Sequence, residues 1–430
     1  MSYPEYLPYQ KKRRLGAGNP LRRILLLLLV FILIGFALFQ IPWVKRVVSW
    51  RLDLAQTYIH RLLNPVESLP APMVSRSTQD PPAVASATPA VETPTPLVSP
   101  TPTLVPTPLP ERTILPAPAY DEARDTQDWN NCGPATLALT LRMFGWDGDQ
   151  YDVSKIVKPT RDDRNVNVDE LVYYVRNHAG WLNVEYRVGG DLQLIKSLIA
   201  EGFPVMIEES FTTDRKYWPE DDQWSGHYLL ITGYDDAMRT FIVQDSEIGP
   251  NQSINYEILD MNWQSFNRVY IVVYRPEQEE QLKQILGEDW DVEKNREKAL
   301  VVAQQETQDD PDNAFTWFNL GTNLTYFDRF VEATQAFDTA RSIGLPQRML
   351  RYQFGPFIAY FQVGRTEDLM TLTKYALDIS RTSEEAMLWR GWGFFQQGDS
   401  SAALSYFRDA LKIREDYEDA LWAIDYLQAQ

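Results

Sequence analysis

The chain has 430 residues, of which 44% are apolar, so it is long enough to bury the cores of two or three domains. Its 41 basic and 59 acidic residues leave a net charge of −18, which disfavours nucleic acid as a partner because its phosphates would be repelled. One cysteine excludes an internal disulfide, and with three histidines it is too little for an ordinary structural zinc site. No metal or organic cofactor is expected.

The N-terminal part of the chain combines a basic tail, residues 1–23, with an uncharged apolar run over residues 24–44. At about 1.5 Å per residue this run can cross the hydrocarbon of a bilayer. The sequence therefore predicts one N-terminal transmembrane helix in the cell membrane. The basic tail places the N-terminus in the cytoplasm and the later domains outside. A cleaved signal peptide is the alternative, but the run is long and no small-residue cleavage site follows it.

A proline-rich stretch separates the apolar run from the first folded domain. Residues 45–64 are predicted to form a juxtamembrane helix. The linker that follows covers residues 65–118, where 15 of 54 residues are proline, and this composition favours extended chain that cannot bury a core. The linker is predicted to act as a spacer that lifts a folded domain off the membrane.

Residues 119–276 show helix signals first and consecutive strand signals later. This order predicts an α+β domain rather than a doubly wound parallel sheet. Helices are expected at 133–144, 167–179 and 191–201, and strands at 181–188, 203–208, 227–234, 240–245 and 268–274.

After a connector over residues 277–292, the pattern from 293 to 430 is helical only and contains an internal repeat. The segment AFTWFNLG at 314–321 recurs as EAMLWRGW at 385–392. These segments and the alanines after them resemble tetratricopeptide repeats, with copies near 314–347 and 384–417 and a stretched, degenerate copy between them. This resemblance implies an all-α solenoid with a concave surface for a protein partner. Deleting 293–430 is then expected to weaken substrate recognition and to spare hydrolysis of a small thioester.

The only cysteine, Cys132, stands in the sequence QDWNNCGPA at the expected start of a helix. Pro134 suits the first helical turn, and Gly145 ends the apolar segment that follows. At a helix N-terminus the unpaired N–H groups and the helix dipole stabilise a thiolate. Cys132 is therefore a candidate nucleophile, and a buried inert thiol is the alternative.

A nucleophilic cysteine needs a base and a group that orients the base. His60 precedes the linker, His178 closes a short helix, and His227 begins an apolar strand, which makes His227 the best candidate. If the turn after this strand centres near Asp236, the hairpin pairs His227 with Asp245, as well as Ile231 with Phe241 and Leu229 with Val243. Asp245 could then hold the imidazole ring, unless it is an ordinary strand-end aspartate.

Gln127 lies five residues before the cysteine, and its side-chain amide could donate to a developing oxyanion beside the Cys132 N–H. A long loop is expected between the strands at 203–208 and 227–234. Loops beside catalytic residues often shape a cleft. The aromatic candidates for substrate contact are Trp129, Tyr217, Trp218 and Trp224.

Gln127, Cys132, His227 and Asp245, together with the CGPA segment, resemble the pattern of papain-like cysteine peptidases of the bacteriocin-processing, double-glycine-leader type. The resemblance covers about 120–275. It implies a papain-like α+β fold and peptide hydrolysis through an acyl-enzyme. The chain is thus predicted to be a membrane-anchored, extracytoplasmic cysteine peptidase acting on a peptide or protein. Two alternatives are a tethered binding scaffold without turnover and an acyltransferase that uses the same residues.

Overall fold

The computed structural model describes residues 20–73, 108–158 and 166–429. The chain divides into two compact units, Met1–Gln56 and Thr57–Gln430. Most of the predicted basic tail and residues 74–107 of the predicted linker lie outside the described residues.

The predicted continuous helix over residues 24–44 is wrong in its extent. Helix α1 (Pro20–Phe39) ends before Gln40, and α2 (Pro42–Leu63) begins two residues later. Pro42 explains the break, because its ring disfavours helical backbone at Ile41 and it has no N–H to continue the helical hydrogen bonds. None of the helices in the described ranges is both long and apolar enough to cross a membrane.

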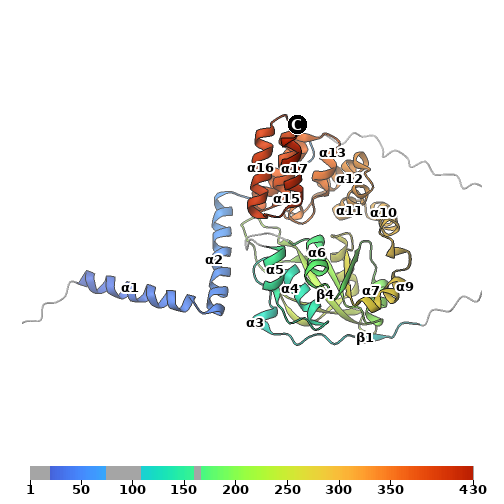
Figure 1. Cartoon of the computed structure of the whole chain (residues 1–430), viewed down its shortest axis with the longest axis horizontal. Coiled ribbons are helices and arrows are strands. Elements are labelled where there is room, and N and C mark those ends of the chain that lie inside the picture. The colour runs from blue at the N-terminus through green and yellow to red at the C-terminus, as the bar shows by residue number, and fades with distance from the viewer. Residues whose placement is uncertain (1–19, 74–107, 159–165, 430) are drawn as a thin grey trace, which may run out of the picture. The chain divides into compact units, whose positions relative to one another are not determined.

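The middle of the chain folds around a seven-stranded sheet, counted within the described residues (Figure 1). Neighbouring strands pair antiparallel in the order β2–β7–β3–β4–β5–β6, and β1 adds to β4. The antiparallel pairing confirms the α+β prediction. The strands are β1 (Arg112–Ile114), β2 (Asn183–Arg187), β3 (Val205–Thr212), β4 (Trp224–Asp235), β5 (Thr240–Asp245), β6 (Gly249–Asn255) and β7 (Tyr270–Tyr274).

Both faces of this sheet are buried, because alternating residues of the central strands enter two separate cores. Tyr228 and Leu230 pack in the core with the helices that precede β2, whereas Leu229 and Ile231 pack in the core with the later helices. The first group comprises α4 (Cys132–Arg142), α5 (Gln150–Val157) and α6 (Val168–His178), and the second α7 (Leu192–Ala200), α8 (Tyr256–Gln264) and α9 (Glu279–Leu286). We call residues 112–274 the sheet domain.

The sequence missed several elements of this domain. The short helix α3 (Glu122–Asp125), α5, α8 and β6 were not expected, since polar residues interrupt their apolar patterns. Strand β3 continues to Thr212 and β4 begins at Trp224, so the expected long loop is shortened to residues 213–223. These strand extensions bring the loop into contact with both the sheet and the helices that follow.

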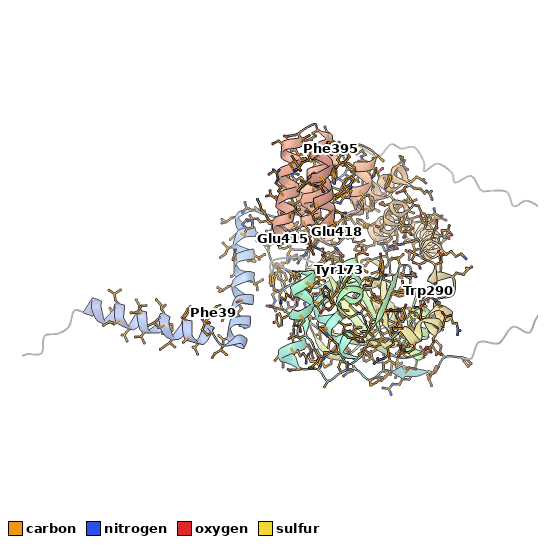
Figure 2. All side chains as sticks on the ribbon, viewed as in Figure 1. Phe39, Tyr173, Trp290, Phe395, Glu415 and Glu418 are labelled. Carbon is orange, nitrogen blue, oxygen red and sulfur yellow. The ribbon has the colours of Figure 1, made fainter. Side chains whose placement is uncertain are left out.

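From Val292 to Gln428 the described chain is helical, and we call this part the helical region. Helices that are adjacent in the sequence contact one another (Figure 1). They are α10 (Val292–Asp309), α11 (Ala314–Tyr326), α12 (Phe330–Ile343), α13 (Gly355–Gln362), α14 (Thr366–Ile379), α15 (Glu384–Gln396), α16 (Ser400–Ile413) and α17 (Glu418–Gln428). Aromatic side chains fill the last layer, where Phe395 of α15 contacts Tyr426 of α17 (Figure 2).

The two outer repeat copies bury the same close contact. A Cβ on Gly321 would lie 2.6 Å from the Phe337 ring, and one on Gly391 would lie 2.4 Å from the Phe407 ring. Each glycine thus lets the aromatic ring of the following helix pack against the helix backbone. In the middle copy the corresponding glycine, Gly355, is the first residue of α13 and does not lie inside a helix. The spacing of this copy therefore differs from that of the two outer copies.

Candidate active site

Cys132 is the first residue of α4, as the sequence predicted, and its side chain is half-buried. The residue before it, Asn131, donates from its amide nitrogen to Oε1 of Gln150 (2.7 Å), so its side chain does not cap the helix. The backbone N–H of Gly133 in the first turn instead hydrogen-bonds to the sulfur. The N-terminus of α4 is therefore directed at the thiol, which favours its anionic form.

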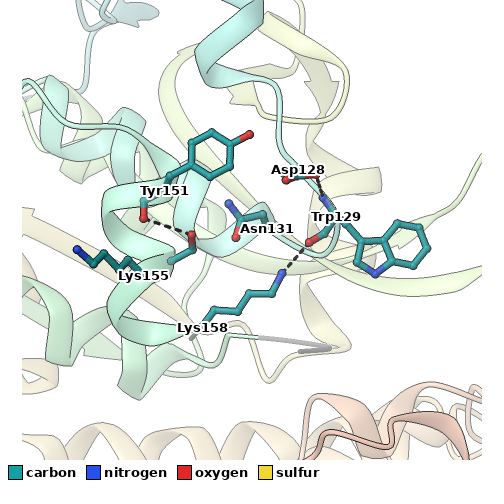
Figure 3. Close-up of a pocket in the computed structure, with 7 residues that line it drawn as sticks. Asp128, Trp129, Asn131, Tyr151, Lys155 and Lys158 are labelled. Carbon is teal, nitrogen blue, oxygen red and sulfur yellow. Dashed lines mark hydrogen bonds between the residues drawn. The ribbon is translucent and has the colours of Figure 1, made fainter. Parts of the chain in front are cut away.

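The loop that leads into Cys132 is held by two buried residues of the α5 segment that the sequence did not single out. The Gln150 amide accepts from Asp128 N (2.8 Å) and donates to Arg124 O (2.9 Å) and Thr126 O (2.8 Å). Lys158 Nζ donates to Trp129 O (2.6 Å), as Figure 3 shows, and to a second carbonyl of the loop. We assign both as positioning residues. No local sequence signal identifies them, because polar residues of a short helix resemble a solvated face.

His227, the fourth residue of β4, and Asp245, the last residue of β5, form a buried pair. The carboxylate can only accept, so His227 Nε2 donates to Asp245 Oδ1 (3.0 Å). Both side chains are at most 4% exposed. With Nε2 engaged by Asp245, Nδ1 is the ring nitrogen that can face Cys132, and His227 and Cys132 each perturb the pKa of the other.

The predicted register of this hairpin is wrong by two residues. Ile231 pairs with Val243 rather than Phe241, because the turn occupies residues 236–239 and a bulge follows Ile231. His227 and Asp245 are consequently not directly opposite. A shift of two residues keeps each side chain on its side of the sheet, so the two groups still meet diagonally.

The three side chains perturb one another's proton affinity in a consistent way. Burial alone would raise the pKa of the Cys132 thiol, but the hydrogen bond and charge of His227 outweigh burial and lower it. Burial opposes a charged imidazole, yet its interactions with Asp245 and Cys132 raise the pKa of His227 well above its ordinary value. Burial would also raise the pKa of Asp245, but the His227 hydrogen bond and charge lower it. This arrangement favours a thiolate–imidazolium pair.

Gln127 lies beside this group through its contact with the residue after Asp245. Its backbone N–H donates to Ser246 O (2.8 Å), and Ser246 Oγ donates to the Gln127 side-chain oxygen (2.9 Å). Because the side-chain oxygen accepts from Ser246, the amide nitrogen is the end that can donate to a ligand.

Two adjacent glutamates of β3 border the site and were not predicted. Glu209 pairs with His227 and Glu208 with Tyr228 across the β3–β4 ladder, and both side chains are buried. Burial raises the pKa of Glu209 to about 8. The charge of His227 lowers this pKa by a smaller amount, and the charge of Asp245 raises it further. Burial and the nearby Cys132 raise the pKa of Glu208 well above its ordinary value. Both carboxyls therefore keep their protons to higher pH than an exposed glutamate does, which reduces the anionic charge beside the thiol.

The loop at residues 213–223, which we call the junction loop, connects the site to the helical region. Tyr217 contacts Trp129 edge to face, with ring centroids 5.7 Å apart. Asp221 organises the loop by accepting from the backbone N–H groups of Tyr217 (2.8 Å) and Gln223 (2.9 Å). Arg348 of the helical region binds both oxygens of Asp221, at 2.6 and 2.7 Å. A residue of one region thus fixes a loop of the other.

Two of the predicted substrate-contacting aromatics, Trp218 and Trp224, lie in this junction. Trp218 is 5% exposed, and Arg348 lies over its ring at 4.1 Å. Trp224 stacks on Phe266 and Phe315, with centroids 5.8 and 6.0 Å away. Both rings are committed to packing, which favours a structural role over substrate contact. Trp129 lies in the loop that leads into Cys132, residues 127–131, which we call the nucleophile loop, and Tyr217 contacts it there.

A pocket of about 270 Å³ lies on the α5 side of the nucleophile loop (Figure 3). It is lined by Asp128, Trp129, Asn131, Tyr151, Ser154, Lys155 and Lys158. The lining does not include Cys132, His227 or Asp245, so the pocket is separate from these three residues.

Comparisons with known proteins agree with this division of the chain. Residues 116–275 match the model of the Peptidase_C39 like family, which is a little over a third of the chain. No curated protein matches the chain significantly.

Solved structures are similar to separate parts of the chain. A C39-like peptidase from Bacillus anthracis is 13% identical with a TM-score of 0.30, and the match covers 39% of this chain and 98% of that one. Xylellain, a cysteine protease from Xylella fastidiosa, is 14% identical with a TM-score of 0.29, covering 39% and 87%. YrrB, a TPR protein, is 17% identical with a TM-score of 0.27, covering 31% and 68%. Residues 116–275 are thus similar to the Peptidase_C39 like family, and a helical region follows them in this chain.

Proposed function

We propose that the chain is a cysteine peptidase that hydrolyses peptide bonds in a peptide or protein substrate. Cys132 is the nucleophile, His227 the general acid and base, and Asp245 the group that orients the imidazole. The oxyanion receives hydrogen bonds from the Gln127 amide and the Cys132 N–H. The observation that carries the proposal is the buried His227–Asp245 hydrogen bond of 3.0 Å beside a thiol at a helix N-terminus.

The reaction proceeds in two steps with these groups. The Cys132 thiolate attacks the carbonyl carbon, and the imidazolium of His227 protonates the leaving amine as the peptide C–N bond breaks. A thioester acyl-enzyme results. Neutral His227 then takes a proton from water, whose oxygen attacks the thioester, and the carboxylic acid product leaves as the thiolate re-forms.

The first test uses the chain's single thiol. Iodoacetamide should alkylate Cys132 in the native chain at about pH 6 at least about tenfold faster than in the chain unfolded in urea, because only the folded site lowers the thiol pKa. Mass spectrometry measures both rates. A native thiol that reacts no faster than the unfolded one would contradict the proposal. Products from a peptide library, with Cys132→Ala as the blank, then identify hydrolysis.

We also propose that α1 attaches the chain to the cell membrane by inserting its apolar side chains into the hydrocarbon. The proposal is supported by apolar side chains that α1 exposes, including Leu27 at 70% and Phe31 at 77%. The chain should stay with membranes after a carbonate wash, and aspartate at both positions should release it because charges are costly in hydrocarbon. Recovery of the unsubstituted chain in the supernatant would contradict attachment.

A further inference from the structure

The residues after α2 lie against the helical region and are contacted there through their backbone. Tyr375 donates its hydroxyl to Glu67 O (3.2 Å). Arg341 donates from Nε to Pro70 O and from Nη2 to Ala71 O, each at 3.0 Å. The next backbone donor, Met73 N–H, bonds Asp368 Oδ1 (3.2 Å). Residues 64–73, the docked segment, contain no helix or strand between Pro65 and Pro72.

One side chain of the docked segment reaches the core of the helical region. Leu69 is 8% exposed and belongs to the apolar cluster that includes Phe337 and Leu372. Its neighbour Ser68 is exposed. Removing a leucine side chain from water is favourable, so this contact contributes to docking in addition to the backbone hydrogen bonds.

The receiving surface is built around a buried charge network. Arg341 is 4% exposed, and its Nη1 also bonds Asp368 Oδ1 (2.9 Å) and the Tyr360 hydroxyl (2.8 Å). Asp368 is bonded in turn by Arg365. Arg341 Nε and one N–H of its Nη2 are satisfied by the two carbonyls of the docked segment. A buried guanidinium with vacant donors is costly, so the network requires an extended backbone at this place.

We propose that residues 64–73 are an internal ligand of the helical region, which recognises an extended, proline-containing peptide by its backbone and one leucine anchor. The 34 residues between Met73 and Pro108 then join two points of the same compact unit. This proposal does not depend on peptidase activity.

The test measures the accessibility of position 69 in the full chain. In a Cys132→Ser background, Leu69→Cys and Ser68→Cys each supply one thiol for maleimide. Docking predicts that the thiol at position 69 reacts at least about tenfold more slowly than the thiol at position 68, since it reacts only when the segment opens. Equal rates for the two adjacent thiols would overturn the proposal.

Two further substitutions should open the segment from opposite sides. Arg341→Met removes the donors to the carbonyls while keeping side-chain bulk, and Met73→Pro removes the N–H that Asp368 accepts without changing the helical region. Each should raise the reaction rate of the thiol at position 69 toward that of the thiol at position 68. Arg329→Met, whose arginine pairs with Glu332, and Met73→Ala, which keeps the N–H, should leave the thiol at position 69 protected. Protection that persists in Met73→Pro would also overturn the proposal.

Discussion

Replacing His227 with alanine should lower kcat/KM for peptide hydrolysis by about 10³-fold or more, because the general base, the general acid and the charge that stabilises the thiolate disappear together. The pKa of the Cys132 thiol should rise, since the hydrogen bond and charge of His227 are what lower it. In the unsubstituted chain the thiolate–imidazolium pair exists between the lowered thiol pKa and the raised imidazole pKa. Hydrolysis should therefore fall on the acid side as the thiolate is protonated, and on the alkaline side as the imidazolium loses its proton.

Two measurements separate this prediction from general damage. The pH profile of alkylation by iodoacetamide should move to higher pH in His227→Ala. His178→Ala is the matched control, because this histidine is exposed on α6 and its ring contacts Tyr173 and Tyr174. It should leave both kcat/KM and the alkylation profile unchanged. An alkylation profile in His227→Ala that coincides with the unsubstituted one would show that the imidazole does not act on the sulfur.

Arg348→Ala should destabilise the fold by about 3–5 kcal/mol, because it leaves the carboxylate of Asp221 buried without its cation. The Asp221 side chain is 0% exposed and that of Arg348 is 3% exposed. Arg348 also donates to Trp224 O (2.9 Å), so the start of β4 loses a contact as well. Since the junction loop carries Tyr217 next to the nucleophile loop, peptide hydrolysis should fall together with stability.

Urea unfolding followed by circular dichroism measures the change in free energy. Arg329→Ala removes an exposed pair with Glu332 and should cost less than about 1 kcal/mol. Adding Asp221→Asn to Arg348→Ala should recover part of the loss, since the buried charge is removed. If Arg348→Ala costs no more than Arg329→Ala, the buried pair does not hold the junction.

The junction also changes what is expected from truncation. Deleting residues 293–430 would remove Arg348 and leave Asp221 unpaired, along with the ring contacts around Trp224. The sequence alone predicted that this deletion would spare hydrolysis of a small thioester, and the contacts predict the opposite. Even hydrolysis of a small thioester should weaken in the truncated chain, because the loop beside the nucleophile would lose its support.

The parts of the site that were predictable depend on short-range patterns. Cys132 could be placed at a helix N-terminus because the proline and the apolar run lie next to it in the chain. The proximity of His227 and Asp245 followed from strand alternation, and it survived a register error because that error was an even number of residues. Strand alternation is insensitive to such shifts.

The parts that were not predictable depend on contacts between distant residues. Arg348 and Asp221 are 127 residues apart, and no periodicity links them. Gln150 acts through hydrogen bonds to the backbone, which leave no pattern of side-chain types. The break between α1 and α2 was missed for a different reason, since the apolar composition that suggested one helix concealed the effect of Pro42.

The buried glutamates of β3 have a consequence for how folding depends on acidity. An unfolded glutamate releases its proton near pH 4.5, whereas Glu209 in the folded protein keeps its proton up to a pKa of about 8. The folded state therefore binds more protons between these values, and the free energy of unfolding declines as pH rises through that interval. Above it the decline ends, because both states are then ionised. Folding at neutral pH is thus coupled to proton uptake, and an alkaline medium opposes it.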